Sequence, residues 1–145
     1  MYSAVIIGCG RIGFFHDLNK KLNGSFTHYK AINKSKSFKL VGLAEKNPSL
    51  RKKILNNTNV PVYLSYKELL DTHKPDLIIL STDDKSHFKI LVSLVKYKPK
   101  FVFAEKPLTL KLEETTKIIS LYKKNSISIS VNFSRRYSAI FQKIN

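Results

Sequence analysis

Three glycines near the start of the chain, Gly8, Gly10 and Gly13, have the spacing Gly-x-Gly-x-x-Gly and directly follow the apolar run 3–7. Such a run is typical of a buried strand, and residues 11–15 are typical of the start of a helix. A strand that turns on glycines into a helix points free backbone N–H groups and the positive end of the helix dipole at one place. The first glycine would allow the tight turn, the second would let a phosphate approach the backbone, and the third would let helix and strand pack closely. The motif therefore predicts a pyrophosphate-binding turn.

Polar or charged residues also follow most of the other predicted strands. In a doubly wound parallel sheet, ligands bind beyond the carboxyl ends of the strands, so these positions define the candidate site. They are Glu45, Ser81 to Asp84, Glu105 to Pro107, and Asn132 to Arg136.

Glu45 stands at the end of the second predicted strand, where an acceptor for the adenosine ribose hydroxyls is expected. A carboxylate there would repel a 2′-phosphate and so favours NAD over NADP, although the neighbouring Lys46 would partly offset this repulsion. The alternative is an ordinary solvated acid at a strand end.

Lys106 lies between an acid and a proline after the fifth predicted strand. A lysine in this place can hold a substrate hydroxyl, or stabilise negative charge as a carbonyl is formed or reduced. The alternative is one more surface lysine. Pro107 fixes the local backbone, and the sequence leaves open whether the peptide bond before it is cis.

The histidines and the one cysteine give weaker signals. His87 falls in the first turn of a predicted helix, where it would either touch the cofactor or serve a structural role. His16, His28 and His73 lack metal-ligand spacing and receive no role in the site. Cys9, between two motif glycines, is expected to be a small buried residue rather than a reactive thiol. Asp83 and Asp84 are candidate helix N-caps that could also reach a ribose hydroxyl.

Short apolar runs that alternate with amphipathic stretches predict the elements that position these residues. We expect a single α/β domain over 1–145, with a doubly wound parallel sheet of about six strands (a Rossmann fold). Helix starts are indicated by Asn47-Pro48 and by a capping box from Ser65 to Glu68. The expected strands are 2–7, 38–44, 62–64, 77–80, 101–104 and 127–131, and the expected helices include 28–34, 85–96 and one over 112–122.

Composition and charge limit the function classes. The single cysteine excludes an internal disulfide, and no apolar run is long enough to cross a bilayer, so we expect a cytoplasmic protein without a membrane partner. The net charge of +16 suggests nucleic-acid binding. However, only four of the 26 basic residues are arginine, and no basic–aromatic alternation is visible. This pattern favours solvated lysine-rich surfaces over nucleic-acid binding.

Four segments resemble motifs of the glucose–fructose oxidoreductase / inositol dehydrogenase family (Gfo/Idh/MocA), in order and at the expected strand ends. Residues 7–13 match the family's opening, and Glu105-Lys106-Pro107 resembles its most diagnostic motif. Ser81-Thr82 with His87 resembles its Thr-Pro-x-x-x-His segment, and residues 131–137 resemble Gly-Phe-Asn-Arg-Arg-Phe. Asp83, Asn132 and Ser134 depart from these patterns. The Thr27-His28 segment with Ala31 also resembles a subgroup associated with sugar metabolism for surface polysaccharides.

The resemblance implies a role for each matching position. The pyrophosphate would lie against Gly8, Cys9, Gly10, Arg11, Ile12 and Gly13, and the adenosine ribose against Glu45. Ser81, Thr82 and His87 would lie along the cofactor, Glu105 and Lys106 would meet nicotinamide and substrate, and Arg136 would approach the nicotinamide end.

The family's proteins continue into an α/β substrate domain that completes proton transfer and usually supports oligomerisation. The chain ends at Asn145, where the connection to that domain should begin, so residues from about 135 are expected to start a linker to an absent domain. The resemblance implies the NAD-binding half (NADP being possible) of an oxidoreductase acting on a sugar or cyclitol, with Lys106 as its catalytic residue and little activity alone. Alternatives are a non-catalytic dinucleotide-binding module or half of a split enzyme, with a polyanion binder last.

Overall fold

Six parallel strands form one sheet in the computed structural model of the protein, which describes residues 1–18, 24–134 and 143. The strand order is β3-β2-β1-β4-β5-β6, and every neighbouring pair is parallel. The predicted doubly wound α/β fold is therefore confirmed. The strands are β1 (Tyr2–Ile7), β2 (Phe38–Ala44), β3 (Val62–Tyr63), β4 (Leu77–Leu80), β5 (Phe101–Ala104) and β6 (Ser128–Val131).

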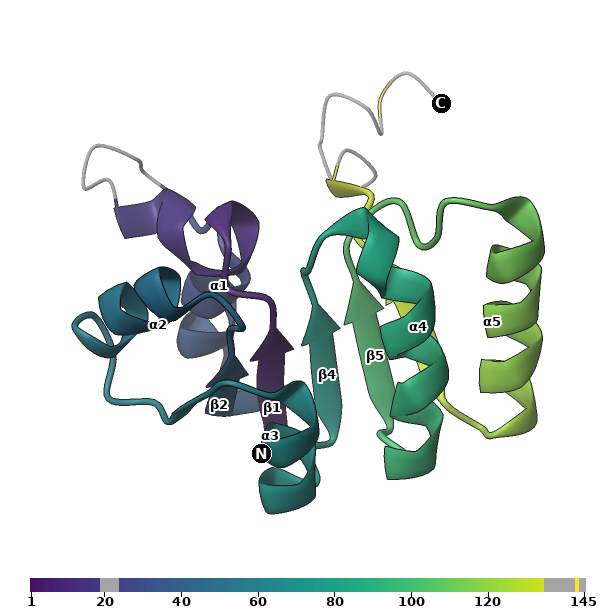
Figure 1. The fold of residues 1–145 in the computed structure, drawn as a ribbon, viewed down its shortest axis with the longest axis horizontal. Coiled ribbons are helices and arrows are strands. Elements are labelled where there is room, and N and C mark those ends of the chain that lie inside the picture. The colour runs from purple at the N-terminus through teal and green to yellow at the C-terminus, as the bar shows by residue number, and fades with distance from the viewer. Residues whose placement is uncertain (19–23, 135–142, 144–145) are drawn as a thin grey trace.

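Figure 1 shows β1, β4 and β5 side by side with their arrowheads at one edge of the sheet. The chain order reverses direction between β1 and β4, which places the topological switch point at that edge. The loops that carry the predicted site residues leave the sheet here.

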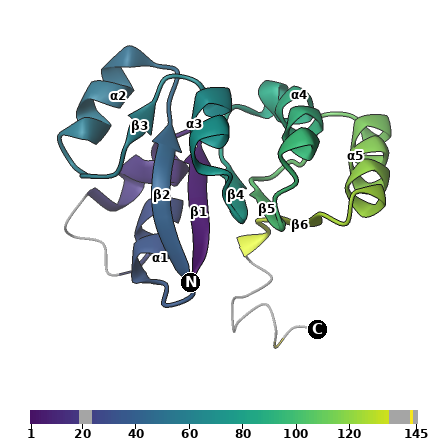
Figure 2. The ribbon, with the colours of Figure 1, turned by 90° about the horizontal axis from the view of Figure 1, so that it is seen from below.

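Within residues 1–18 and 24–134, five α-helices and three short helical turns connect the strands. Figure 2 shows α4 and α5 on the side of the sheet opposite to α1. The helices are α1 (His28–Lys34), α2 (Pro48–Leu55), α3 (Tyr66–His73), α4 (Asp84–Leu94) and α5 (Leu112–Lys124). The turns are η1 (Arg11–Phe15, a π-helix), η2 (His16–Leu18) and η3 (Val95–Tyr97), the last two being 3-10 helices.

Side-chain caps explain where several helices begin. Thr27 accepts a hydrogen bond from the backbone N–H of Lys30, and Asn47 accepts two at the start of α2, as the Asn-Pro pair predicts. Ser65 caps α3 through the N–H of Lys67. Asp83 is the N-cap residue of α4, as predicted, but its side chain makes no cap hydrogen bond. Its carboxylate instead pairs with Lys46.

The apolar core is divided by the sheet into two clusters. On one face Leu69 of α3, Leu91 of α4 and Ile118 of α5 pack against β1, β4 and β5. On the other face Phe14, Ile32 of α1 and Ile54 of α2 pack against β1, β2 and β4. Within the described residues, no helix is long and apolar enough to span a membrane.

Candidate functional site

The glycine turn has a different constraint at each of its three glycines. Gly8 has a φ of +87°, a left-handed conformation, and a Cβ there would lie 2.6 Å from the carbonyl oxygen of Ser81. At Gly13 a Cβ would collide with the carbonyl oxygen of Gly8, so this glycine permits η1 to pack against the turn. At Gly10 nothing lies within 4 Å of such a Cβ. The space beside Gly10 is therefore open to a ligand.

The first turn of η1 directly follows Gly10. The backbone N–H groups of Arg11, Ile12 and Gly13 belong to the first turn, so they have no acceptor within the helix. The side chains of Arg11 and Ile12 are exposed, whereas Cys9 is completely buried. Burial raises the pKa of the Cys9 thiol far above its ordinary value, and the nearby Glu45 carboxylate raises it further. The thiol is therefore neutral, in agreement with a packing role.

Glu45 follows β2 and is 7% exposed. Its Oε2 accepts the backbone N–H of Cys9 at 2.9 Å, and its Oε1 accepts that of Asn47 at 2.8 Å. A carboxylate oxygen has capacity for more than one donor, so Glu45 can still accept a hydrogen bond from a ligand hydroxyl.

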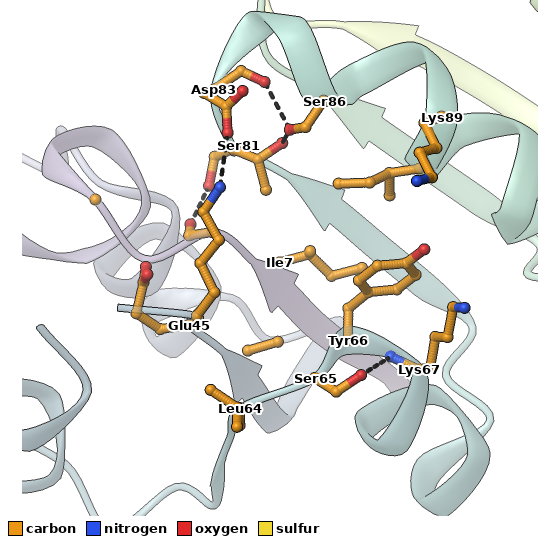
Figure 3. Close-up of a pocket in the computed structure, with 16 residues that line it drawn as sticks. Ile7, Glu45, Leu64, Ser65, Tyr66, Lys67, Ser81, Asp83, Ser86 and Lys89 are labelled. Atoms are coloured by element: carbon orange, nitrogen blue, oxygen red, sulfur yellow. Dashed lines mark hydrogen bonds and ion pairs between the residues drawn. The ribbon is translucent and has the colours of Figure 1, made fainter. Parts of the chain in front are cut away.

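A cavity of about 600 Å³ lies at the carboxyl ends of β1, β2 and β4. Figure 3 shows Glu45 on one wall of it, with Ser81 and Asp83 across from Leu64 and Ser65. The cavity brings together six of the predicted site residues, namely Gly8, Gly10, Glu45, Ser81, Thr82 and Asp83.

Ser81 and Thr82 hold the wall of this cavity that follows β4. The Ser81 hydroxyl donates to the carbonyl oxygen of Gly8, and its backbone N–H donates to that of Ile7 at 2.8 Å. The Thr82 hydroxyl accepts from Ser86 at 2.8 Å. Ser81 thus ties the loop after β4 to the glycine turn.

Sequence reasoning missed the wall that follows β3. Leu64, Ser65, Tyr66 and Lys67 line the cavity, and the helix-start signal at Ser65 already marked this loop as another strand end. The sequence also gave no sign that Lys46 Nζ would lie 3.3 Å from the carboxylate of Asp83. Both of those side chains are largely exposed.

A second group of predicted residues gathers at the end of β5. Oε1 of Glu105 accepts from Nε2 of His28 at 2.8 Å and from the amide nitrogen of Asn132 at 2.7 Å. Partial burial alone would raise the pKa of Glu105, but these hydrogen bonds outweigh it and the pKa lies below its ordinary value. His28, which received no role from the sequence, is thus part of this group.

Lys106 follows Glu105 and its side chain is exposed at the same edge of the sheet. The Lys106–Pro107 peptide bond is cis. The carbonyl oxygen of Pro107 lies 2.9 Å from Nδ1 of His87, which is completely buried and does not line the cavity.

Arg136 lies outside the described residues. Within the described part of the chain, no three His, Cys, Asp or Glu side chains could together hold a metal ion.

A glycine turn at the topological switch point of a parallel sheet is typical of dinucleotide-binding proteins. The model of the oxidoreductase family with an NAD-binding Rossmann fold (Gfo/Idh/MocA) matches residues 2–133. The chain belongs to this family.

Relatives and solved structures match nearly the whole chain. Myo-inositol 2-dehydrogenase of Thermotoga maritima is 29% identical over 142 residues, which cover 96% of this chain and 38% of that enzyme. The WlbA dehydrogenase from Bordetella pertussis, solved with NADH and UDP-GlcNAcA, aligns at 20% identity with a TM-score of 0.82, covering 99% of this chain and 40% of that one. An oxidoreductase from Agrobacterium radiobacter, solved with NAD+, L-tartaric acid and magnesium, aligns at 17% identity with a TM-score of 0.81, covering 99% and 38%. The chain thus spans about 38% of the curated relative's length.

Proposed function

We propose that the chain is the cofactor-binding half of an oxidoreductase that transfers hydride between NAD and a hydroxyl or carbonyl carbon of a sugar or cyclitol. The observation that carries the proposal is the cavity in which the glycine turn and the Glu45 carboxylate meet. A dinucleotide needs a phosphate cradle and a ribose acceptor side by side, and these residues supply both.

The residues around the cavity fit the adenosine and pyrophosphate half of the cofactor. The open space at Gly10 and the donors of Arg11, Ile12 and Gly13 would receive the pyrophosphate. Glu45 would accept hydrogen bonds from the adenosine ribose, and its negative charge would disfavour a 2′-phosphate. We therefore infer a preference for NAD over NADP.

Glu105 and Lys106 would serve the nicotinamide half and the substrate. Bound nicotinamide supplies the hydride acceptor or donor, a chemistry that no side chain provides. The exposed ammonium of Lys106 would hold the substrate oxygen and stabilise negative charge on it as the carbonyl is formed or reduced. Ser81, Thr82 and His87 would support the path between the two halves, and Arg136 would approach the nicotinamide end.

The proposed substrate class is supported by two similar proteins, a myo-inositol dehydrogenase and a dehydrogenase solved with UDP-GlcNAcA. Because the chain spans less than half of their length, the residues that select a substrate and complete proton transfer would come from a further domain. This partial coverage equally suits a dinucleotide-binding half that is completed by a separate chain.

Titration of the chain with NADH, followed by nicotinamide fluorescence or calorimetry, tests the proposal. We expect saturable binding of NADH and weaker binding of NADPH. A folded sample that binds neither NADH nor ADP at millimolar concentration would refute the proposed function.

A further inference from the structure

His28 contacts Glu105 across 77 positions of the sequence. It is the first residue of α1, and its Nε2 lies 2.8 Å from Glu105 Oε1 at the end of β5. Asn132, which follows β6, approaches the same oxygen at 2.7 Å. Donors from two separate elements thus converge on one oxygen of the carboxylate that follows β5.

Neighbouring contacts hold His28 in this position. The side chain is 9% exposed, and the ring stands edge-on against Phe103 with centroids 5.7 Å apart. The preceding residue, Thr27, donates its backbone N–H and its hydroxyl to Asp17 at 2.6 and 2.7 Å. Because Thr27 also caps α1, the start of this helix and the histidine on it are fixed together.

Both side-chain donors contact Oε1, and the backbone N–H of Lys106 also supports the carboxylate. A carboxylate that is held through one oxygen presents the other in a defined direction, at the strand end that carries Lys106. The Glu105 side chain is 15% exposed, so part of it remains open to a ligand.

We propose that His28 is a positioning residue: together with Asn132 it fixes the Glu105 carboxylate so that Oε2 accepts a hydrogen bond from a hydroxyl of the nicotinamide-nucleoside half of the cofactor. The proposal rests on the proposed function, because it requires a dinucleotide in the cleft. Sites of this kind need supporting hydrogen bonds that hold the contacting group close to its productive geometry.

A purely structural role for the His28–Glu105 pair would have a different signature. Loss of stability would weaken all ligands alike, whereas loss of positioning weakens only ligands that reach the end of β5. ADP occupies the cavity at Gly10 and Glu45 but lacks the nicotinamide nucleoside. Comparison of NADH with ADP therefore separates the two roles.

The test uses the full chain and its variants H28L and H28Q, with NADH and ADP affinities measured by calorimetry and folding by circular dichroism. We expect H28L to bind NADH about tenfold more weakly and ADP unchanged, since a hydrogen bond to a charged group is lost. H28Q should recover most of the NADH affinity, because the glutamine amide nitrogen stands as many bonds from Cα as the histidine Nε2. The matched control is H73L, which removes a histidine bonded to Tyr63 far from Glu105 and should change neither affinity.

The outcomes distinguish this inference from the proposed function. If the native chain binds neither ligand, the proposed function fails and the inference fails with it. If the native chain binds both and H28L weakens neither, or both equally, the inference is overturned while the proposed function stands. Should H28L fail to fold, N132L removes the other donor and is expected to show the same selective loss of NADH affinity, and an equal effect on both ligands would overturn the inference.

Discussion

Glu45 joins the end of β2 to the glycine turn after β1, because its Oε2 accepts the backbone N–H of Cys9 at 2.9 Å. Its other oxygen accepts the backbone N–H of Asn47 at 2.8 Å. The same side chain is therefore the proposed ribose acceptor and the support of the turn that would hold the pyrophosphate.

The substitution E45Q is expected to destabilise the fold. An amide has only one oxygen, so its NH2 group must face the backbone N–H of either Cys9 or Asn47, and one backbone donor loses its acceptor. The free energy of unfolding should fall by about 1–3 kcal/mol, measured by urea denaturation. D71N makes the same carboxyl-to-amide change on an exposed residue of α3 and should stay within about 0.5 kcal/mol of the native value. Equal stabilities of E45Q and D71N would contradict this account.

The glycines of the turn should separate stability from binding. G13A places a Cβ against the carbonyl oxygen of Gly8 and is expected to lower stability by about 1–3 kcal/mol. G10A places its Cβ in open space, so its melting temperature should match that of the native chain while NADH affinity drops at least severalfold. Thermal melts and NADH titrations of both variants check this prediction. A stable G13A or an unfolded G10A would show that the turn is packed differently.

Local patterns in the sequence predicted most of the fold. The apolar run Leu77–Leu80 has the same bounds as β4, and the cap at Thr27 begins α1 at the predicted residue. The regular helix expected after the glycine turn is instead the short π-helix Arg11–Phe15 followed by a 3-10 turn. The helix predicted over 85–96 is α4 (Asp84–Leu94), which tightens into the 3-10 turn Val95–Tyr97.

The candidate site was less predictable where it depends on contacts between distant residues. Gly8, Glu45 and Ser81 share a cavity because parallel strands end at one edge, a relationship that topology supplies. The contact of His28 with Glu105 depends on the tertiary packing that brings the start of α1 to the end of β5, and no spacing within the sequence encodes it. The motif segment Thr27-His28 was the only signal, and it points to a subgroup rather than to a contact.

Acid should weaken the fold through Asp76, which precedes β4. The Lys100 ammonium at 2.9 Å and the hydrogen bonds from the backbone and hydroxyl of Ser3 lower the pKa of Asp76 to about 2. Because the pKa in the folded state lies below the unfolded value of about 3.9, this contribution to stability is present in full above about pH 5 and is lost as the pH falls toward 2.

Urea denaturation of the native chain and D76N over this pH range measures the effect. The difference in unfolding free energy between them should be constant from pH 7 to about pH 5 and shrink steadily below that. D71N serves as the exposed control, and a difference between native and D76N that persists unchanged at the acid end would exclude Asp76 as the titrating group.

Cys9 should resist thiol reagents as long as the chain is folded. The side chain is completely buried, and burial together with the Glu45 carboxylate keeps the pKa of its thiol above the ordinary value, so neither access nor the reactive thiolate is available. Ellman's reagent is expected to release little colour from the native chain and one equivalent after denaturation. E45Q removes the negative charge but leaves the burial, so labelling of that variant in native buffer should rise only as far as its lower stability exposes the thiol. Rapid labelling of the native chain would mean that the glycine turn opens without global unfolding, and the support that Glu45 gives to the turn would then be too weak to preorganise a phosphate site.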